Sequence, residues 1–271
     1  MKITPEFAEI IGVYVGDGYL RYKNNCGELD ISGSYEEKNY YDNHLIPLFN
    51  KTFDAEIKGR YYPHRKTYGF RTSNKDIIKS FKELGFSSGA KSTSVRVPRA
   101  IMETDKTKII AGFLKGYFDT DGCVTFRNRK GGQNYSEFKR KFHYYPRIQL
   151  ISVSKKLIED VCILLNKLEI KYYTSTYKPK NINWKQTYKI LIAGPLKLNM
   201  WINKIGTKNP CKVSRIEIWK EHGFCPPFTT YNQRINILEG KLNFDPRQRV
   251  RLYKNLFYLL PSAVRPYLLF I

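Results

Sequence analysis

One stretch of sequence occurs twice in this chain: residues 10–18 read IIGVYVGDG and residues 114–122 read LKGYFDTDG. Both stretches are largely apolar and end in Asp-Gly. The two copies align Gly12 with Gly116, Gly16 with Thr120, and Asp17 with Asp121. A repeat of this kind determines the architecture. It also places one carboxylate at the same position in each copy.

Small residues within each stretch lie four positions apart, so they share one face of a helix. Gly12 and Gly16 form this face in the first copy, and Gly116 and Thr120 form it in the second. Helix faces lined by small residues allow two helices to pack closely. If the two copies pair about a pseudo-twofold axis, the two Asp side chains emerge side by side. A single Asp-Gly is better explained as a helix stop, but an equivalent acid in both copies favours a function.

The composition indicates an anionic partner. The 271 residues include 47 Lys and Arg against 24 Asp and Glu, for a net charge of +23 spread along the chain. Nucleic acid is the usual partner of such a domain. A membrane surface is the alternative, but we find no basic amphipathic helix, lipidation motif or long apolar run. No secretory signal is recognisable, and five scattered cysteines without zinc spacing favour a reducing compartment, cytoplasmic in a prokaryote or organellar in a eukaryote.

Hydrophobic periodicity and turn residues predict an α+β fold with the order αββαββα in each half and antiparallel sheets. The first repeat is expected at residues 1–102, the second at 103–223, and a helical extension at 224–271. The first expected helix ends at Gly18. Further helices are expected at 36–52, 74–85, 107–120, 155–168 and 195–205. The expected strands cover 19–25, 28–34, 56–62, 67–72, 123–129, 145–153, 171–178 and 186–192. In the extension, 232–242 and 246–260 have a helical pattern.

Two neighbouring carboxylates repel each other unless a cation lies between them. Magnesium typically binds one or two carboxylates together with water and phosphate oxygens. Such a site can support phosphodiester hydrolysis, and the charge of the chain makes DNA or RNA the expected phosphodiester.

The two motifs, about a hundred residues apart in a basic chain, resemble those of the LAGLIDADG homing endonucleases in their single-chain form. The resemblance covers about residues 4–222 and is closer in the second motif. The first motif departs from the family pattern, because Val15 stands where the family often has an acid and Gly16 precedes Asp17.

The resemblance implies that Asp17 and Asp121 bind Mg²⁺, with Ca²⁺ or Mn²⁺ as substitutes, and that the carbonyls of Gly16 and Thr120 join them. It also implies basic groups around the metals. Sequence position suggests Lys155 at a strand-to-helix corner of the second half, where the first half has Tyr35. The loops after the last helix of each half suggest Lys91 and Lys208. Each lysine can equally be a solvated surface charge.

The resemblance further implies that the sheets form a DNA-binding saddle. Because alternate residues of a strand face the same way, the sequence places polar side chains on one face after each acid. The candidates for DNA contact are Arg21, Lys23, Asn25, Asp30, Ser32, Ser34, Arg60, Arg71, Thr125, Arg127, Arg129, Arg147, Gln149, Lys178 and Lys189. We expect a bulge at Leu150 and Ile151, where alternation breaks, and we expect the basic loop 127–141 to follow phosphates.

These features predict a monomeric, intron-encoded endonuclease that makes a metal-dependent, staggered double-strand break with 3′ overhangs in a long, non-palindromic DNA target. The alternatives are an RNA maturase of the same fold that binds intron RNA, or a nucleic-acid-binding protein without catalysis. Retention of both acids favours the enzyme. An endonuclease domain from an intein is a further alternative, although no splicing blocks are recognised around the repeat.

Overall fold

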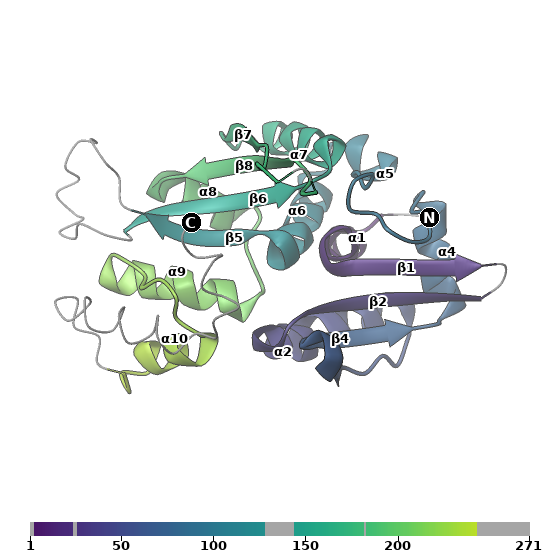
Figure 1. Cartoon of the computed structure of the whole chain (residues 1–271), viewed down its shortest axis with the longest axis horizontal. Coiled ribbons are helices and arrows are strands. Elements are labelled where there is room, and N and C mark those ends of the chain that lie inside the picture. Colours follow the sequence, from purple (N-terminus) through teal and green to yellow (C-terminus); the bar gives the residue numbers. More distant parts are fainter. Residues whose placement is uncertain (1–2, 24–25, 128–143, 182, 243–271) are drawn as a thin grey trace.

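The computed structural model describes residues 3–23, 26–127, 144–181 and 183–242. Two halves of the same design face each other across a central pair of helices, α1 (Pro5–Asp17) and α6 (Thr107–Asp121) (Figure 1). Each half contributes one four-stranded antiparallel sheet, with strand orders β1-β2-β4-β3 and β5-β6-β8-β7. The predicted α+β fold with two pseudo-symmetric repeats is therefore confirmed.

The elements of the first half follow the predicted order. Its strands are β1 (Gly18–Lys23), β2 (Cys26–Ser34), β3 (Arg60–Tyr62) and β4 (Thr67–Thr72). Its helices after α1 are η1 (Tyr35–Glu37), α2 (Lys38–Tyr40), η2 (Tyr41–Leu45), α3 (Ile46–Phe53), η3 (Pro63–Arg65) and α4 (Lys75–Glu83). A short helix, α5 (Arg99–Met102), lies in the connection to the second half.

The second half repeats this order and adds two helices. Its strands are β5 (Cys123–Arg127), β6 (Tyr145–Ser152), β7 (Tyr173–Tyr177) and β8 (Thr187–Ala193). Its helices after α6 are α7 (Lys155–Lys167), α8 (Pro195–Lys204), α9 (Pro210–His222) and α10 (Tyr231–Leu238). No helix within the described part of the chain has the length and apolar character to cross a bilayer.

Glycine creates the close contact between α1 and α6. A Cβ atom on Gly12 would lie 2.1 Å from the carbonyl oxygen of Phe113, and one on Gly116 would lie 2.0 Å from that of Glu9. Neither carbonyl can move aside without moving its helix, so only glycine allows this separation. The small faces predicted from the sequence do pack against each other, and apolar residues of both helices are buried in one continuous core.

Three local expectations need correction. The predicted helix over 36–52 is a series of segments with a wide π turn over Tyr41–Leu45. The turn immediately precedes α3, where Pro47 has no N–H to donate and its ring crowds the preceding turn. The loop predicted after α8 instead begins helix α9, with Asn209 as its N-cap and Pro210 in its first turn.

The predicted bulge at Leu150 and Ile151 is also wrong. Residues from Arg147 to Ser152 pair one by one with β8, without an inserted residue. The alternation is regular, because Leu150 points into the core while Ile151 is 37% exposed on the outer face. The apparent break is therefore an apolar residue on the exposed side. The predicted helix 246–260 and most of the basic loop 127–141 lie outside the described residues.

Candidate active site between the two halves

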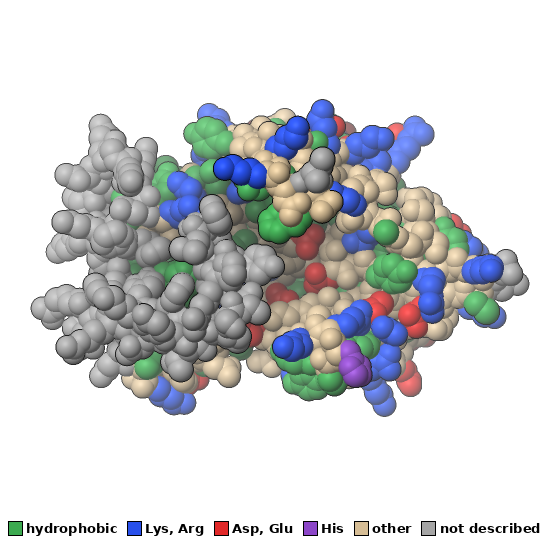
Figure 2. All heavy atoms as spheres, viewed as in Figure 1, with side chains coloured by type: hydrophobic (Ala, Val, Ile, Leu, Met, Phe, Trp, Pro, Cys, Tyr) green, Lys and Arg blue, Asp and Glu red, His purple; other side chains and the backbone are tan. Residues whose placement is uncertain are grey.

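The two motif acids come together at the ends of the paired helices. Asp17 is the last residue of α1 and Asp121 is the last residue of α6. A Cβ atom on Gly16 would lie only 3.3 Å from the carboxyl carbon of Asp121. Figure 2 shows acidic side chains in a hollow between the halves, with Lys and Arg side chains around it. The helix packing thus delivers both carboxylates to one place.

Asp17 is half-buried among other oxygen atoms. The Tyr41 hydroxyl donates a 3.0 Å hydrogen bond to its Oδ2. Gly33 leaves the space in which these groups meet, because a Cβ there would lie 2.6 Å from Glu37 Oε2 and 3.0 Å from both Asp17 Oδ2 and the Tyr41 hydroxyl. Burial, Glu37 and Asp121 raise the pKa of Asp17 to about 7, against the opposing effects of the Tyr41 hydrogen bond and Lys212.

Asp121 occupies a more exposed position than Asp17. Loss of hydration in the recess raises the pKa of Asp121, while the ammonium groups of Lys91 and Lys212 oppose this change. The two acids therefore share the same pair of cations, and a divalent ion would relieve their repulsion.

A lysine from each half contacts the last turn of each motif helix. Lys91 Nζ donates 2.8 Å hydrogen bonds to the carbonyls of Val15 and Gly16. Lys212 Nζ donates to the carbonyls of Asp119, at 2.6 Å, and Thr120, at 3.4 Å. These carbonyls occupy equivalent positions in the repeat. Because cations are favourable at a helix C-terminus, each lysine stabilises the helix end that presents an acid.

Alignment of the two repeats proposed Lys91, which the structure places at the end of α1, and did not indicate Lys212, which lies at the end of α6. Lys208, the residue aligned by sequence, has an exposed side chain and contributes its backbone N–H to Asp119 Oδ2 at 2.7 Å. Lys212 lies one helical turn further on, in α9. The Asn-Pro pair at 209–210 is a helix-start signal that could have revealed this. Lys155 begins α7 and pairs with Glu159 at 3.5 Å.

Asp119 marks a difference between the halves. This side chain is fully buried, accepts from the Thr207 hydroxyl and from the Lys208 N–H, and anchors the chain before α9. Burial raises the pKa of Asp119 to about 6, with Lys212 the main opposing charge. The equivalent residue of the first half is Val15, which is also buried but makes no such anchor.

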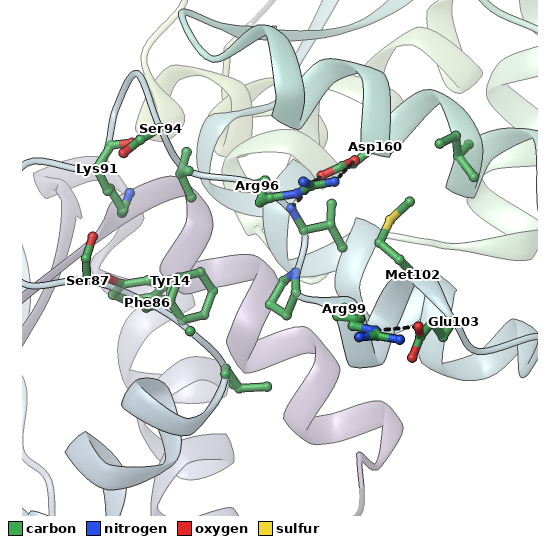
Figure 3. Close-up of a pocket in the computed structure, with 16 residues that line it drawn as sticks. Tyr14, Phe86, Ser87, Lys91, Ser94, Arg96, Arg99, Met102, Glu103 and Asp160 are labelled. Carbon is green, nitrogen blue, oxygen red and sulfur yellow. Dashed lines mark hydrogen bonds and ion pairs between the residues drawn. The ribbon is translucent and has the colours of Figure 1, made fainter.

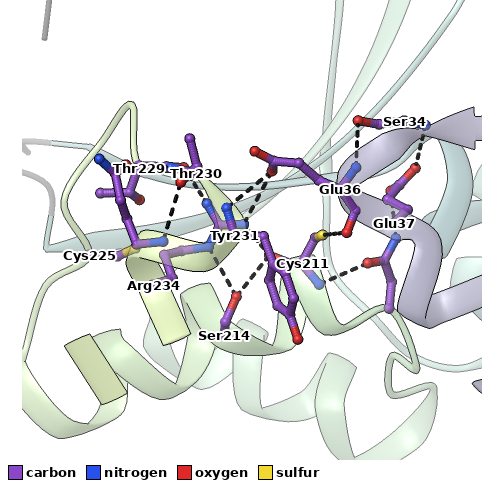
Figure 4. A network of polar contacts seen from close by, with 12 residues as sticks. Ser34, Glu36, Glu37, Cys211, Ser214, Cys225, Thr229, Thr230, Tyr231 and Arg234 are labelled. Atoms are coloured by element: carbon purple, nitrogen blue, oxygen red, sulfur yellow. Dashed lines mark hydrogen bonds and ion pairs between the residues drawn. The ribbon is translucent and has the colours of Figure 1, made fainter. Parts of the chain in front are cut away.

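Glu37 is a third acid near the site that the sequence did not indicate. It closes a capping box with Ser34 and accepts a 2.7 Å hydrogen bond from Asn209 at the start of α9. The neighbouring Glu36 accepts from the Tyr231 N–H and pairs at 3.9 Å with the buried Arg234 of α10 (Figure 4). The corner of the first half that carries Tyr35 is thus connected to α9 through Glu37 and to α10 through Glu36.

The oxygen atoms at this site suit a hard divalent cation. Asp17 and Asp121 supply the carboxylates, and Glu37 and the Tyr41 hydroxyl gather beside Asp17 at Gly33. The carbonyls of Gly16 and Thr120, predicted to join them, each accept from a lysine ammonium. No group of three or more His, Cys, Asp and Glu side chains within the described ranges can hold a metal alone. A bound ion would therefore need phosphate oxygens and water.

The chain connecting the halves lines an open pocket of about 540 Å³, and Lys91 is one of the lining residues (Figure 3). Arg96 crosses it to pair with Asp160 of α7 at 3.0 Å, and Asp160 also accepts from the Val97 N–H. These contacts fix the connecting segment to the second half. They therefore also fix the segment that carries Lys91.

The outer faces of the sheets carry the predicted polar residues. In the first half, Arg21, Lys23, Ser34, Arg60 and Arg71 are exposed and Ser32 is half-buried. In the second half, Lys178 is exposed, and Thr125, Arg127, Arg147, Gln149 and Lys189 are half-buried. Asp30 is instead buried beneath arginines. Asn25 and Arg129 lie outside the described residues.

The family comparison matches the second half. Residues 108–206 match the family described as LAGLIDADG-like domain. The chain is 26% identical over 225 residues to a glutamine–fructose-6-phosphate aminotransferase of Methanocaldococcus jannaschii, covering 79% of this chain and 17% of that protein. An uncharacterized protein of the same organism is 27% identical over 191 residues, covering 68% and 62%. The chain spans less than two thirds of each relative.

Solved structures with a similar arrangement include the homing endonuclease I-DmoI in complex with DNA and Mn, at 17% identity and a TM-score of 0.49, covering 76% of this chain and 98% of that one. The N-terminal LAGLIDADG domain of DUF199/WhiA has a TM-score of 0.41 at 15% identity, covering 76% and 83%. The family match is confined to residues 108–206, and residues 10–18 repeat the motif that ends at Asp121 and Gly122 within that match.

Proposed function

We propose that this protein is a site-specific DNA endonuclease that cuts both strands of a long, non-palindromic target. The convergence of Asp17 and Asp121 at equivalent helix ends carries the proposal. Repulsion between the two acids and the raised pKa of Asp17 are the electrostatic conditions that favour a bound divalent cation.

Asp17 and Asp121 would hold Mg²⁺, or Mn²⁺ or Ca²⁺ in its place. Such an ion supplies charge stabilisation at the scissile phosphate and lowers the pKa of water. Lys91 and Lys212 fix the helix ends that present the acids, and their charge favours an approaching phosphate. Burial lowers the pKa of Lys91, while Asp121 and Asp17 oppose this change.

The two sheets would bind the DNA on either side of the acids. Polar and basic residues follow each acid at equivalent strand positions, as strands that enter a major groove require. The halves carry different residues on these faces, which favours two different half-sites. One chain with both acids needs no second copy, so we propose a monomer. Cutting across the minor groove would leave 3′ overhangs.

The genetic setting is also a proposal. Proteins named as an aminotransferase, a probable translation initiation factor and a replicative DNA helicase match this chain over only 17%, 10% and 24% of their own lengths. We infer that the matched segment is a unit found in unrelated protein contexts. This favours a transferable element, either intron-encoded, as the sequence suggested, or inserted in a host protein.

A selection followed by cleavage tests the proposed activity. The Asp17→Asn/Asp121→Asn double variant would select bound DNA from a random library, and each selected target would then be incubated with Mg²⁺ and wild-type protein. We expect wild-type protein to cut both strands and each single variant to lose about 10³-fold or more. Asp76→Asn, an exposed acid on α4, is the control.

Equal cutting by wild type and both single variants would overturn the assignment. Tight binding of a selected DNA without cutting by wild type would point to a binding protein. Tight, metal-independent binding of intron RNA without DNA cutting would point to a maturase.

A further inference from the structure

Three arginines converge on the outer face of the first sheet. Arg60 lies in the edge strand β3, Arg65 in the turn η3, and Arg71 in the inner strand β4. We refer to these three residues as the arginine cluster. All three side chains are exposed. The sequence predicted Arg60 and Arg71 as DNA contacts but did not indicate Arg65.

Asp30 lies beneath the cluster and holds two of its members. Its side chain is only 5% exposed. Arg71 Nε donates to Asp30 Oδ2 at 2.7 Å, and Arg65 pairs with the same oxygen at 3.0 Å. A buried carboxylate is poorly hydrated, so its two guanidinium partners supply the compensating charge and hold it in place. The predicted DNA contact Asp30 is therefore a support for the arginines above it.

Tyr62 holds the cluster from the side. Its ring centroid lies 4.9 Å from the guanidinium carbon of Arg60, 4.4 Å from that of Arg65 and 5.2 Å from that of Arg71. Arg60 Nε also donates to the Tyr62 hydroxyl at 3.0 Å. Cation–π contacts of this kind restrict long side chains that are otherwise free. All three cations thus contact one ring, and two of them also pair with the buried acid.

The restraint on Arg71 leaves part of its guanidinium available. Asp30 accepts from Nε at 2.7 Å, while Glu28 lies at the longer distance of 3.8 Å from the NH1 atom. The side chain is 36% exposed on an inner strand of the sheet. Strands can enter a groove, where side chains that reach base edges read sequence and side chains that reach phosphates fix the position of the protein.

We propose that Arg71 reads a guanine in the half-site bound by the first half, as a specificity-determining residue positioned by Asp30 and Tyr62. The proposal rests on the DNA-binding function proposed above. The terminal nitrogens of Arg71 would donate to guanine O6 and N7, the paired acceptors that arginine recognises in the major groove. Arg60 and Arg65, at the sheet edge, would contact phosphates.

The second half lacks this reader at the equivalent positions. Asp30 pairs with Tyr19, two residues after Asp17, and with Arg71. In the second half, Gln149 pairs with Cys123, two residues after Asp121, and with Leu191. Gln149 and Leu191 thus replace Asp30 and Arg71. The same comparison aligns Tyr62 with Tyr177. At the position equivalent to Arg71, the second half has Leu191 and no arginine.

The test is a binding-site selection from random DNA without divalent metal, followed by affinity measurements on every single-base change of the selected target. Wild type, Arg71→Lys, Tyr62→Leu and Tyr62→Phe would be compared. The control Arg99→Lys changes an exposed arginine on α5 that pairs with Glu103. Circular dichroism melting would verify the fold of each variant.

We expect wild type to prefer guanine at one position of one half-site by about 5- to 150-fold. Arg71→Lys should lose this preference at that position alone, because lysine offers no planar pair of donors. Tyr62→Leu should weaken it at the same position, and Tyr62→Phe and Arg99→Lys should preserve it.

Two results would overturn the inference and leave the proposed function intact. The first is an unchanged guanine preference in Arg71→Lys. The second is an equal loss of affinity for all sequences with a smaller salt dependence, which would make Arg71 a phosphate contact. Failure of wild type to select any DNA sequence would instead contradict the proposed function itself.

Discussion

The two halves of the protein are alike at the central axis and different on their sheet faces. At the axis, each half supplies a glycine for the helix contact, an aspartate at the helix end, and a lysine that donates to the two preceding carbonyls. On the outer faces, the first half has the cross-strand pair Asp30 and Arg71. The second half has Gln149 and Leu191 at the equivalent positions. Shared geometry holds the acids, while each face is free to diverge.

Even the similar features arise from different elements. Lys91 lies in the loop after α4, whereas its counterpart Lys212 lies in the additional helix α9. Asp119 anchors the chain before α9, and Val15 has no such role. Equivalent positions of the charged groups are therefore preserved even where the chain that supplies them differs. This pattern is expected when one reaction site serves two unlike half-sites.

The largest effect should follow from disrupting the close contact between α1 and α6. We expect Gly116→Ala and Gly12→Ala each to lower the free energy of unfolding by about 1–3 kcal/mol or more, because either new Cβ would meet a backbone carbonyl of the other helix. Chemical denaturation would measure this. The two losses should be similar, since the contact is symmetric.

Ala111→Ser serves as the control, because this half-buried residue lies on α6 beside the contact. It should change the free energy of unfolding much less. Wild-type stability of both glycine variants would show that the helices do not pack as described.

A smaller effect should follow from removing the lysines. Lys91→Met and Lys212→Met should each slow cleavage about 10- to 100-fold, comparable to losing a charge-assisted hydrogen bond. Both lysines lower the pKa of Asp121. Each variant should therefore also move the rising part of the rate–pH profile to higher pH.

The comparison of Lys212 with Lys208 distinguishes the structural assignment from the sequence alignment. We expect the greater loss in Lys212→Met, and a greater loss in Lys208→Met would favour the alignment. Lys79→Met, on the exposed side of α4, controls for a general change in charge.

The sequence predicted most of the architecture because the repeat has strong local signals. Thr4 caps α1, its hydroxyl accepting from the Phe7 N–H at 3.2 Å, and Pro5 stands at the first helical position. The glycines predicted the helix contact, since no other residue fits there. Alternation predicted which side of β1 and β5 is exposed.

Long-range contacts account for what the sequence did not predict. Lys212 and Glu37 approach the acids only because α9 packs against the first-half corner, and no local pattern encodes that contact. Asp30 was predicted to face DNA because alternation along its strand places it on the outer face of the sheet. Its burial depends on Arg65 and Arg71, which arrive from elements more than thirty residues away.

The most direct test of the account is a carbon-13 titration of the Asp17 carboxyl by NMR, in wild type and in Asp121→Asn. We expect a midpoint of about 7 in wild type, because burial and the neighbouring acids raise the pKa of Asp17. The raised pKa contributes stability at low pH that is lost as pH rises through 7. In Asp121→Asn the midpoint should fall, and Asp76→Asn should leave it unchanged. A midpoint near the ordinary value of about 4, unaffected by Asp121→Asn, would contradict the claim that the two motif acids form one site.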